Sequence, residues 1–347
     1  MLQSDRPHRR FNPLTGEWVL VSPHRTQRPW QGETEETSEE SLPSYDSGCY
    51  LCPGNSRAGG NKNPDYTDTF VFANDFPALL PDAPDGETNV DDLIVGHNER
   101  GTCRVMCFSP RHDLTIALMQ TEQIRKVVDA WVEEYRQLGS RDYINYVQIF
   151  ENRGQMMGCS NPHPHCQIWA NETVPVLPGK KSYNQKEYLQ YRGSILLLDY
   201  LRIELAQKER VVMENDSFVT LVPYWAVWPF ELMVIPREHT RHIGELSDTA
   251  RTDLADMMRR IGVTYDNLFK TNFPYSMGIH QAPTDGESHE AWQMHLSYLP
   301  PLLRSATVKK FMVGYELLAM PQRDITAEAA AERLRSQENI HYRMRGA

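Results

Sequence analysis

The stretch GCSNPHPHCQIWA (residues 158–170) places His163, His165 and Gln167 at alternating positions. Its second half, HCQIWA, has the β-branched and aromatic content of a strand. Because side chains alternate between the faces of a strand, we expect these three residues to line one wall, roughly 6 to 7 Å apart. Pro164 fixes the backbone between the two histidines and gives up a ladder hydrogen bond, which indicates a constrained and functional segment.

A neutral imidazole in such a segment can act as a nucleophile. An acceptor that holds one ring nitrogen as N–H leaves the lone pair of the other nitrogen free. Attack on phosphorus then gives an energy-rich N–P bond, which a second phosphate nucleophile breaks readily. The triplet H-x-H-x-Q by itself fits a metal-binding pair or solvent-facing polar residues equally well.

Elements of similar order occur on both sides of this stretch. Strands are predicted at 69–81 and 102–112, then a helix capped by Thr121 and ended by Gly139, then strands at 146–154 and 165–170. The same order returns with strands at 218–230 and 231–239, a helix from about Ser247, and a strand holding His295. A final helix is expected after Thr326.

FSPRH (108–112) and VIPREH (234–239) close corresponding strands of the two series. We therefore predict an α+β fold with a duplicated unit, whose antiparallel strands join into one sheet with helices packed on it. The predicted halves are residues 1–185 and 186–347. A chance likeness of two ordinary α+β patterns is the alternative.

Composition limits the classes of function. The chain has 347 residues and a net charge of −10, so an anionic substrate has to be met by a local basic cluster, and no nucleic-acid partner is indicated. The N-terminus lacks the apolar region of a signal peptide, and no stretch approaches the roughly 20 apolar residues of a membrane span. We expect no membrane association and a cytoplasmic location.

Six cysteines are too few for a disulfide scaffold in a chain of this length. Cys49-Tyr-Leu-Cys52 is a C-x-x-C knuckle that suits two thiolates on one zinc ion. A redox pair or two buried thiols remain alternatives to a metal site.

The motif HPHCQIWA resembles that of the galactose-1-phosphate uridylyltransferase family of the histidine triad superfamily. The resemblance runs from about residue 8 to the C-terminus and includes RRFNPLTGEWVLVSPHR, NKNPDY, FENRG, GCSNPHPH, FPYSMG and PPLLRSATVKKFMVGYE. Hydrolases of the superfamily have H-x-H-x-H, whereas the transferases have glutamine in the third place, as Gln167 is here. The resemblance implies two histidine-triad-like halves, with His165 as the nucleophile and Gln167 as the residue that holds the uridylyl phosphate.

The reaction implied by the resemblance is a ping-pong exchange. UDP-glucose gives glucose 1-phosphate and a uridylyl-His165, and galactose 1-phosphate then takes the uridylyl group as UDP-galactose. The positions that match nucleotide contacts are Arg25, Arg28, Asn74, Asp75, Phe76, Asn152, Gly158, Cys159 and Ser160. The positions that match hexose contacts, which the family takes from the partner subunit, are Lys310, Phe311, Val313, Tyr315, Glu316 and Gln322. A homodimer with shared sites is expected, and no redox cofactor.

The resemblance also implies two metal sites. His112 and His163 complete a Cys2His2 set with Cys49 and Cys52, interpreted as structural zinc. A second site in the family, for iron or zinc, uses one glutamate and three histidines. The positions that correspond to it are His280, His295, Ser297 and Lys181, so two ligands are missing and we expect an absent or weak site, unless His289 or Glu290 substitutes.

Cys166 departs from the small glycine that the family carries between the nucleophile and the glutamine. By alternation its side chain is expected on the opposite face, where it is tolerated; if it crowded the phosphate instead, the rate would fall.

Two other functions compete with the transferase. A related nucleotidyl hydrolase or phosphorylase is disfavoured by Gln167 and by the hexose-like segment KKFMVGYE. A non-enzymatic, zinc-stabilised nucleotide-binding module is disfavoured by the intact pair of His165 and Gln167.

Overall fold

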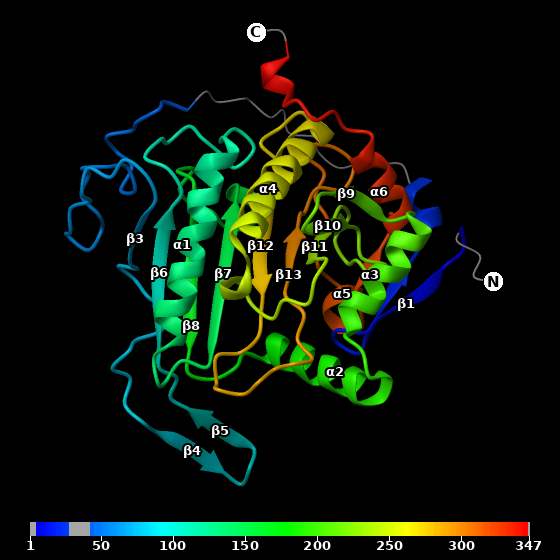
Figure 1. Ribbon diagram of the computed structural model, residues 1–347, viewed down its shortest axis with the longest axis horizontal. Coiled ribbons are helices and arrows are strands. Elements are labelled where there is room, and N and C mark those ends of the chain that lie inside the picture. Colours follow the sequence, from blue (N-terminus) through cyan, green and yellow to red (C-terminus); the bar gives the residue numbers. More distant parts are fainter. Residues whose placement is uncertain (1–4, 28–41, 346–347) are drawn as a thin grey trace.

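The computed structural model describes residues 5–27 and 42–345 and is organised around a nine-stranded sheet (Figure 1). Its strand order is β3-β6-β8-β7-β12-β13-β11-β10-β9, and every pairing in it is antiparallel. The strands are β3 (Phe70–Ala73), β6 (Gly101–Cys107), β7 (Tyr146–Arg153), β8 (His165–Asn171), β9 (Val211–Glu214), β10 (Phe218–Leu221), β11 (Leu232–Pro236), β12 (Tyr275–His280) and β13 (His295–Leu299).

The predicted duplication is confirmed by the topology. From the seam between β7 and β12, one half runs outward as β7-β8-β6-β3 and the other as β12-β13-β11-β10, so β8 and β13 occupy equivalent places. The seam pairs Tyr275 with Arg153 and continues to Ile279 opposite Ile149. The α+β fold with one continuous antiparallel sheet is therefore as expected.

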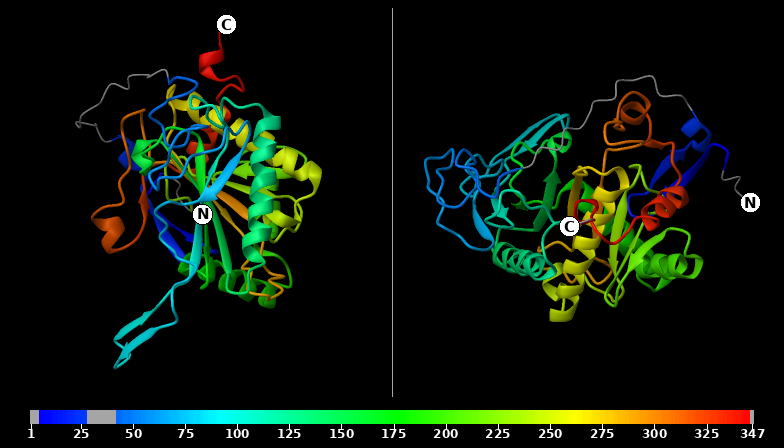
Figure 2. Two further views of the ribbon diagram at one scale, coloured as in Figure 1. Left: turned by 90° about the vertical axis from the view of Figure 1, so that its left-hand side faces the viewer. Right: turned by 90° about the horizontal axis from the view of Figure 1, so that it is seen from above.

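Two helices, α1 (Thr121–Gly139) and α4 (Asp248–Phe269), cover one face of the sheet and pack against each other (Figures 1 and 2). Apolar residues recur along both helices at intervals of three and four, which puts them on one face. Trp131 and Ile261, both fully buried, lie in the same core as Ile149 and Ile168 of the sheet. This core spans both halves and makes the sheet a rigid platform.

At two of the three predicted helix starts, the structure agrees with the prediction from the sequence. Ser247 accepts a hydrogen bond from the Ala250 N–H at 3.1 Å, and Thr326 does the same for Ala329 at 3.2 Å at the start of α6 (Ala327–Arg335). The prediction that Thr121 caps α1 is wrong, because Thr121 is the first helical residue. Gln120 is the capping residue, and the Gln123 side chain accepts its N–H at 3.0 Å.

On the other face of the sheet, separate parts of the chain cover β3 and β6 on one side and β13, β11 and β10 on the other, where His295 and Ser297 of β13 are buried. A lobe holding Cys49, Leu51 and Cys52 packs over β3 and β6. At the far side, α3 (Leu196–Gln207) packs with Leu14 and Val19 over β10 and β11. Between these two covers, the open face of β8 remains accessible.

Several elements were not predicted. They are the sheet strands β9 and β12, the hairpin β1 (His8–Asn12) and β2 (Glu17–Val21) with its parallel neighbour β14 (Gln322–Arg323), the hairpin β4 (Glu87–Val90) and β5 (Ile94–His97), and the helices α2 (Val176–Arg192), α3 and α5 (Tyr315–Leu318). Short 3-10 turns lie at Pro23–Gln27, Gln155–Met157, Ile243–Glu245 and Tyr342–Met344.

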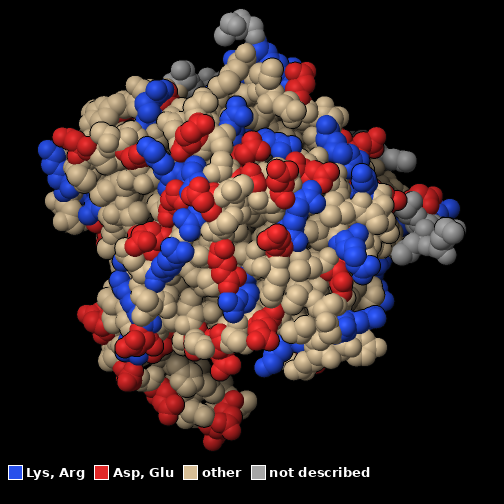
Figure 3. Space-filling view, in the orientation of Figure 1, with Lys and Arg blue, Asp and Glu red and all other residues tan. Residues whose placement is uncertain are grey.

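The hairpin of β4 and β5 projects from the body in both Figure 1 and the left view of Figure 2. Acidic and basic side chains are interspersed over the face that carries α1 and α4, and acidic ones gather on this hairpin (Figure 3), where Glu87, Asp91 and Asp92 are exposed. Within the described part of the chain, no helix is both long and apolar enough to cross a membrane.

Candidate active site

His165 is the first residue of β8, and His163 lies in the bend before the strand. His165 and Gln167 share the open face of the sheet, whereas Cys166 is buried on the opposite face, where its Sγ accepts the Trp131 Nε1–H at 3.3 Å. The Cys166 side chain therefore points to the face opposite His165 and Gln167, as alternation predicted. The expectation that all three polar residues line one wall is wrong, because His163 and Gln167 border different cavities.

The tautomer of His165 is set by the backbone. Its Nδ1 lies 2.7 Å from the carbonyl oxygen of His163, and a carbonyl only accepts, so Nδ1 carries the hydrogen and Nε2 keeps its lone pair. Burial lowers the pKa of His165 below the usual histidine range, which favours the neutral ring at neutral pH. These are the properties of a nitrogen nucleophile.

The amide of Gln167 is oriented in a similar way. Its Oε1 accepts the Trp169 Nε1–H at 3.0 Å, and an indole nitrogen only donates. The NH2 group of Gln167 is therefore the end left to donate to an anionic oxygen beside His165. Trp169 is itself held by an edge-on contact with Phe150, with ring centroids 5.6 Å apart.

A cavity of about 350 Å³ opens next to His165 and Gln167. It gathers most residues expected to contact a nucleotide, namely Asn74, Asp75, Phe76, Asn152, Gly158, Cys159 and Ser160. Gly158 has a φ of 78°, in the left-handed region that favours glycine, and ends the turn at Gln155–Met157. The turn brings backbone groups and small side chains to the edge of the cavity.

A second cavity, of about 290 Å³, lies on the other side of His165 and was missed in the sequence. Arg153 donates to Asp266 at 2.8 Å, and Asp266 also contacts His341 Nε2 at 3.1 Å. Glu151 accepts the Tyr275 hydroxyl at 3.1 Å, and burial raises the pKa of Glu151 to about 7. The charged residues Glu151 and Arg153, at alternate positions of β7, were the available signal.

Other predicted contacts are not assembled around His165 within one chain. Arg25 binds Asp324 at 3.0 Å and borders neither cavity, and Arg28 lies outside the described residues. None of the expected hexose contacts lines these cavities either. Lys310 bonds Glu316 at 2.9 Å and also the Gln322 carbonyl, while Phe311, Val313 and Tyr315 are 60%, 56% and 51% exposed. The segment around α5 projects from the face opposite α1 and α4 (Figure 2, left).

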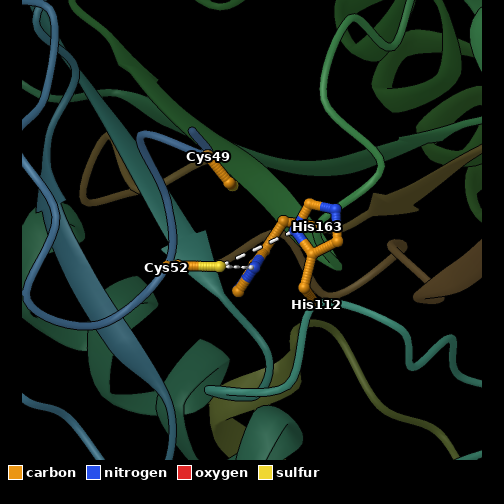
Figure 4. A group of neighbouring side chains, drawn as sticks. All are labelled: Cys49, Cys52, His112 and His163. Atoms are coloured by element: carbon orange, nitrogen blue, oxygen red, sulfur yellow. Dashed lines mark hydrogen bonds between the residues drawn. The ribbon is translucent and has the colours of Figure 1, made fainter. Parts of the chain in front are cut away.

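The four residues expected to bind zinc come together from three places in the chain (Figure 4). Cys49, Cys52, His112 and His163 are all buried, and their ligand atoms lie within 4.8 Å of one another. His163 Nε2 lies 2.9 Å from the Ser109 carbonyl oxygen, so its Nδ1, 3.6 Å from Cys52 Sγ, keeps its lone pair for the cluster. Burial lowers the pKa of His163 to about 4, which keeps the ring neutral, as a ligand must be. This donor set can hold a metal ion.

The residues at the positions that correspond to the family's second metal site lie together, but one of them, Lys181, contributes an amine. His280 and His295 stack with ring centroids 4.8 Å apart, and Lys181 Nζ lies 2.9 Å from His295 Nε2. His289 is elsewhere and contacts Asp285 at 2.6 Å, and Glu290 is exposed.

Comparison with known proteins gives consistent matches over the whole chain. The model of the galactose-1-phosphate uridyl transferase N-terminal domain matches residues 1–175, and that of the C-terminal domain matches residues 181–346. The galactose-1-phosphate uridylyltransferase of Haemophilus influenzae is 53% identical over 99% of this chain and 97% of its own length. That of Rattus norvegicus is 50% identical over 98% of this chain and 90% of its own.

Solved structures also resemble this fold. A uridylyltransferase structure superposes with a TM-score of 0.74 at 27% identity, covering 94% of this chain and 97% of that chain. An ADP-glucose phosphorylase from Arabidopsis thaliana, solved with bound ADP-glucose, superposes with a TM-score of 0.75 at 24% identity, covering 96% and 99%.

Proposed function

Because this chain belongs to the galactose-1-phosphate uridylyltransferase family, and is thus a nucleotidyltransferase, we propose the following exchange for it. UDP-glucose and galactose 1-phosphate are converted to glucose 1-phosphate and UDP-galactose, with a uridylyl-His165 between the two half-reactions. The observation that carries the proposal is the 2.7 Å contact between His165 Nδ1 and the His163 carbonyl, at the border of the nucleotide-sized cavity.

In the first half-reaction, the Nε2 lone pair of His165 attacks the α-phosphorus of UDP-glucose. The N–P bond forms as the bond from phosphorus to the bridging oxygen breaks, and glucose 1-phosphate leaves with that oxygen. The ring gains positive charge, which the His163 carbonyl stabilises through the Nδ1–H. In the second half-reaction, a phosphate oxygen of galactose 1-phosphate attacks phosphorus, and His165 leaves as the neutral ring.

Gln167 stabilises charge on the phosphoryl oxygens through its NH2 group, which the Trp169 contact leaves free. An amide does not titrate, so it neither protonates a leaving group nor activates water. This favours transfer to a second phosphate over hydrolysis.

The binding roles are proposed from the cavity and the family pattern. Asn74, Asp75, Phe76, Asn152 and the turn at 158–160 bind the nucleotide, with Arg25 and Arg28 for its phosphates. Because the segment from Lys310 to Gln322 lies away from its own cavities, we propose a homodimer in which each chain completes the other's hexose site. A division into halves 1–185 and 186–347, and a cytoplasmic location, are part of the same proposal.

Zinc is the ion that we propose for the cluster of Cys49, Cys52, His112 and His163. Two thiolates and two imidazoles suit tetrahedral zinc with no open position. The ion would tie the lobe that covers β3 and β6 to the segment just before β8, so its role is structural.

The test is to incubate the protein with UDP-glucose labelled in the α-phosphate, without acceptor, and to locate acid-labile label by mass spectrometry. We expect label on His165, discharged by galactose 1-phosphate to UDP-galactose. His165→Gly should abolish labelling, whereas His97→Gly on the projecting hairpin should not change it.

Other outcomes would contradict the proposal in distinct ways. Discharge at the same rate by water indicates a hydrolase, and discharge by inorganic phosphate in preference to the hexose phosphate indicates a phosphorylase. Tight nucleotide binding without label indicates a binding module.

A further inference from the structure

The helix α2 has an unusual inward face. Its buried residues are Pro178, Lys181 and Gln185, of which the last two are polar. Lys181 is only 6% exposed and Gln185 is fully buried. Apolar packing normally holds a helix on a sheet, but α2 contributes only the half-buried Tyr188 to the neighbouring apolar core, so it needs a further means of attachment.

Hydrogen bonds to the start of β13 provide this attachment. Gln185 Oε1 accepts the Gln293 N–H at 3.0 Å. One turn earlier on the same helix, Lys181 Nζ lies 2.9 Å from His295 Nε2. Residues four apart lie on one side of a helix, so the two contacts act together.

The direction of the Lys181 bond follows from the other ring nitrogen. His295 Nδ1 lies 3.2 Å from the Gln293 carbonyl oxygen and must carry the hydrogen, which leaves Nε2 as an acceptor for the amine. Burial lowers the pKa of Lys181 to about 7. Both the ammonium and the neutral amine carry N–H groups, so this bond does not depend on which form is present.

These residues do not fit a metal ion. The amine uses the His295 lone pair that a metal would need, and a charged amine would repel a cation. His280 Nδ1 is buried without a partner, but Ser297 offers only a hydroxyl. Among the residues that the structure describes, three or more His, Cys, Asp or Glu ligands converge only at the Cys2His2 cluster.

We propose that the ε-amino group of Lys181 takes the place of a metal ion between α2, β12 and β13, so that this part of the protein is held together without metal. The buried carboxylate of Glu231, which accepts the Val227 N–H at 2.7 Å and the Trp228 N–H at 3.1 Å, favours the charged amine. The inference concerns structure and does not depend on uridylyl transfer.

The first test is the metal content of the wild-type protein, purified without chelator and measured by plasma mass spectrometry. We expect one zinc per chain, lost in the Cys49→Ser/Cys52→Ser variant. A second equivalent that disappears in His280→Ala/His295→Ala would overturn the proposal. A missing first equivalent would instead count against the zinc cluster, so the two failures are distinguishable.

The second test removes the donor with Lys181→Met, which keeps a long apolar side chain. Amide hydrogen exchange in residues 176–192 should become about tenfold faster, as expected for loss of one buried hydrogen bond. The matched control is Lys180→Met, because Lys180 pairs with Glu17 at the surface at 2.9 Å. Equal exchange in the two variants would show that Lys181 does not anchor α2.

The third test asks whether the pocket has the dimensions of a metal site. The variant K181E/S297H replaces the amine by a carboxylate and adds an imidazole beside His280 and His295. With zinc supplied, we expect a second equivalent per chain and exchange in α2 close to wild type. Failure to bind this second equivalent of zinc would contradict the proposal that the Lys181 amine takes the place of a metal ion.

Discussion

Two short hydrogen bonds within one segment decide what the reactive side chains can do. His163 fixes the tautomer of His165 through its carbonyl, and Trp169 fixes the amide of Gln167 through its indole N–H. Both partners lie two residues from the group they orient. A ring nitrogen and an amide are thus presented to the same cavity in defined states.

Trp169→Phe tests the second of these bonds. Phenylalanine keeps a ring against Phe150 but cannot donate to Gln167, so the amide loses its fixed orientation. We expect kcat to fall about tenfold, as for partial loss of an oriented donor, with little change in Tm. Trp18→Phe on the 43% exposed Trp18 is the control, and an unchanged kcat in both would remove the orienting role of Trp169.

Glu151 predicts a pH dependence of stability. Its folded-state pKa is raised from 4.5 to about 7, so its stability contribution is complete below 4.5 and is lost as pH rises through 7. Glu151→Gln should match the wild type near pH 4.5 and exceed it at pH 8 by roughly 3 kcal/mol in urea unfolding. The exposed Glu187→Gln should show no such trend, and a constant difference for Glu151→Gln would contradict the assignment.

For single residues, the sequence predicted which residues form the candidate site better than it predicted where their side chains lie. His165, Gln167 and the Cys2His2 cluster were predicted from motifs and from the resemblance to the family. The four residues of the cluster do lie together. The predicted orientation of the His163 side chain was wrong because the chain bends there before β8 begins. A bend before a strand leaves no periodic signal in the sequence. The roles of the individual site residues stay predictions.

The lobe that carries Cys49 and Cys52 depends on the cluster more than on apolar packing. Its own core contains few residues besides Leu51 and the two cysteines. His163, one of the four residues proposed to bind zinc, comes just before β8, so the lobe and the strand that carries His165 share one attachment point.

Removing the zinc ion that we propose for this cluster should therefore lower stability first. We expect Cys49→Ser/Cys52→Ser, or a strong zinc chelator, to lower Tm by roughly 10 °C, with activity lost as the lobe loosens. Cys103→Ser, a buried cysteine outside the cluster, controls for the cost of a buried hydroxyl. If chelation abolished activity without changing Tm, the metal would have a direct catalytic role instead.

Element prediction succeeded where periodicity is strong. Both α1 and α4 follow from apolar residues at helical spacing, and seven of the nine sheet strands from runs of β-branched and aromatic residues, whereas β9 and β12 were not predicted. The helix α2 was missed because its inward residues are Lys181 and Gln185, which a search for an apolar stripe does not count. Short hairpins such as β4 and β5, exposed along their whole length, lack an inward face altogether.

The whole molecule is joined by the pairing of β7 with β12. Either half alone would expose one of these strands as an unpaired edge, and such edges promote aggregation. The two halves therefore complete one sheet, although the duplication within it is visible in the sequence.

Cutting the chain tests this dependence. Halves separated between Thr173 and Val174 keep α2 with the β13 residues that anchor it, and co-expression should give a soluble complex. Separation between Gln185 and Lys186, the proposed boundary of the halves, divides α2 and should give several-fold less complex, because the two halves share this helix. Each half expressed alone should aggregate, and a soluble, monomeric half would argue against the seam as a requirement.

The topology places His295 at the start of β13 as His165 stands at the start of β8. In one half this position opens to a cavity, and in the other it is buried and bonded to Lys181. Under the mechanism that we propose, the duplicated architecture thus offers a single acceptor for the nucleotide, His165. Saturating the protein with donor in the absence of a hexose phosphate would stop at one uridylyl group per chain.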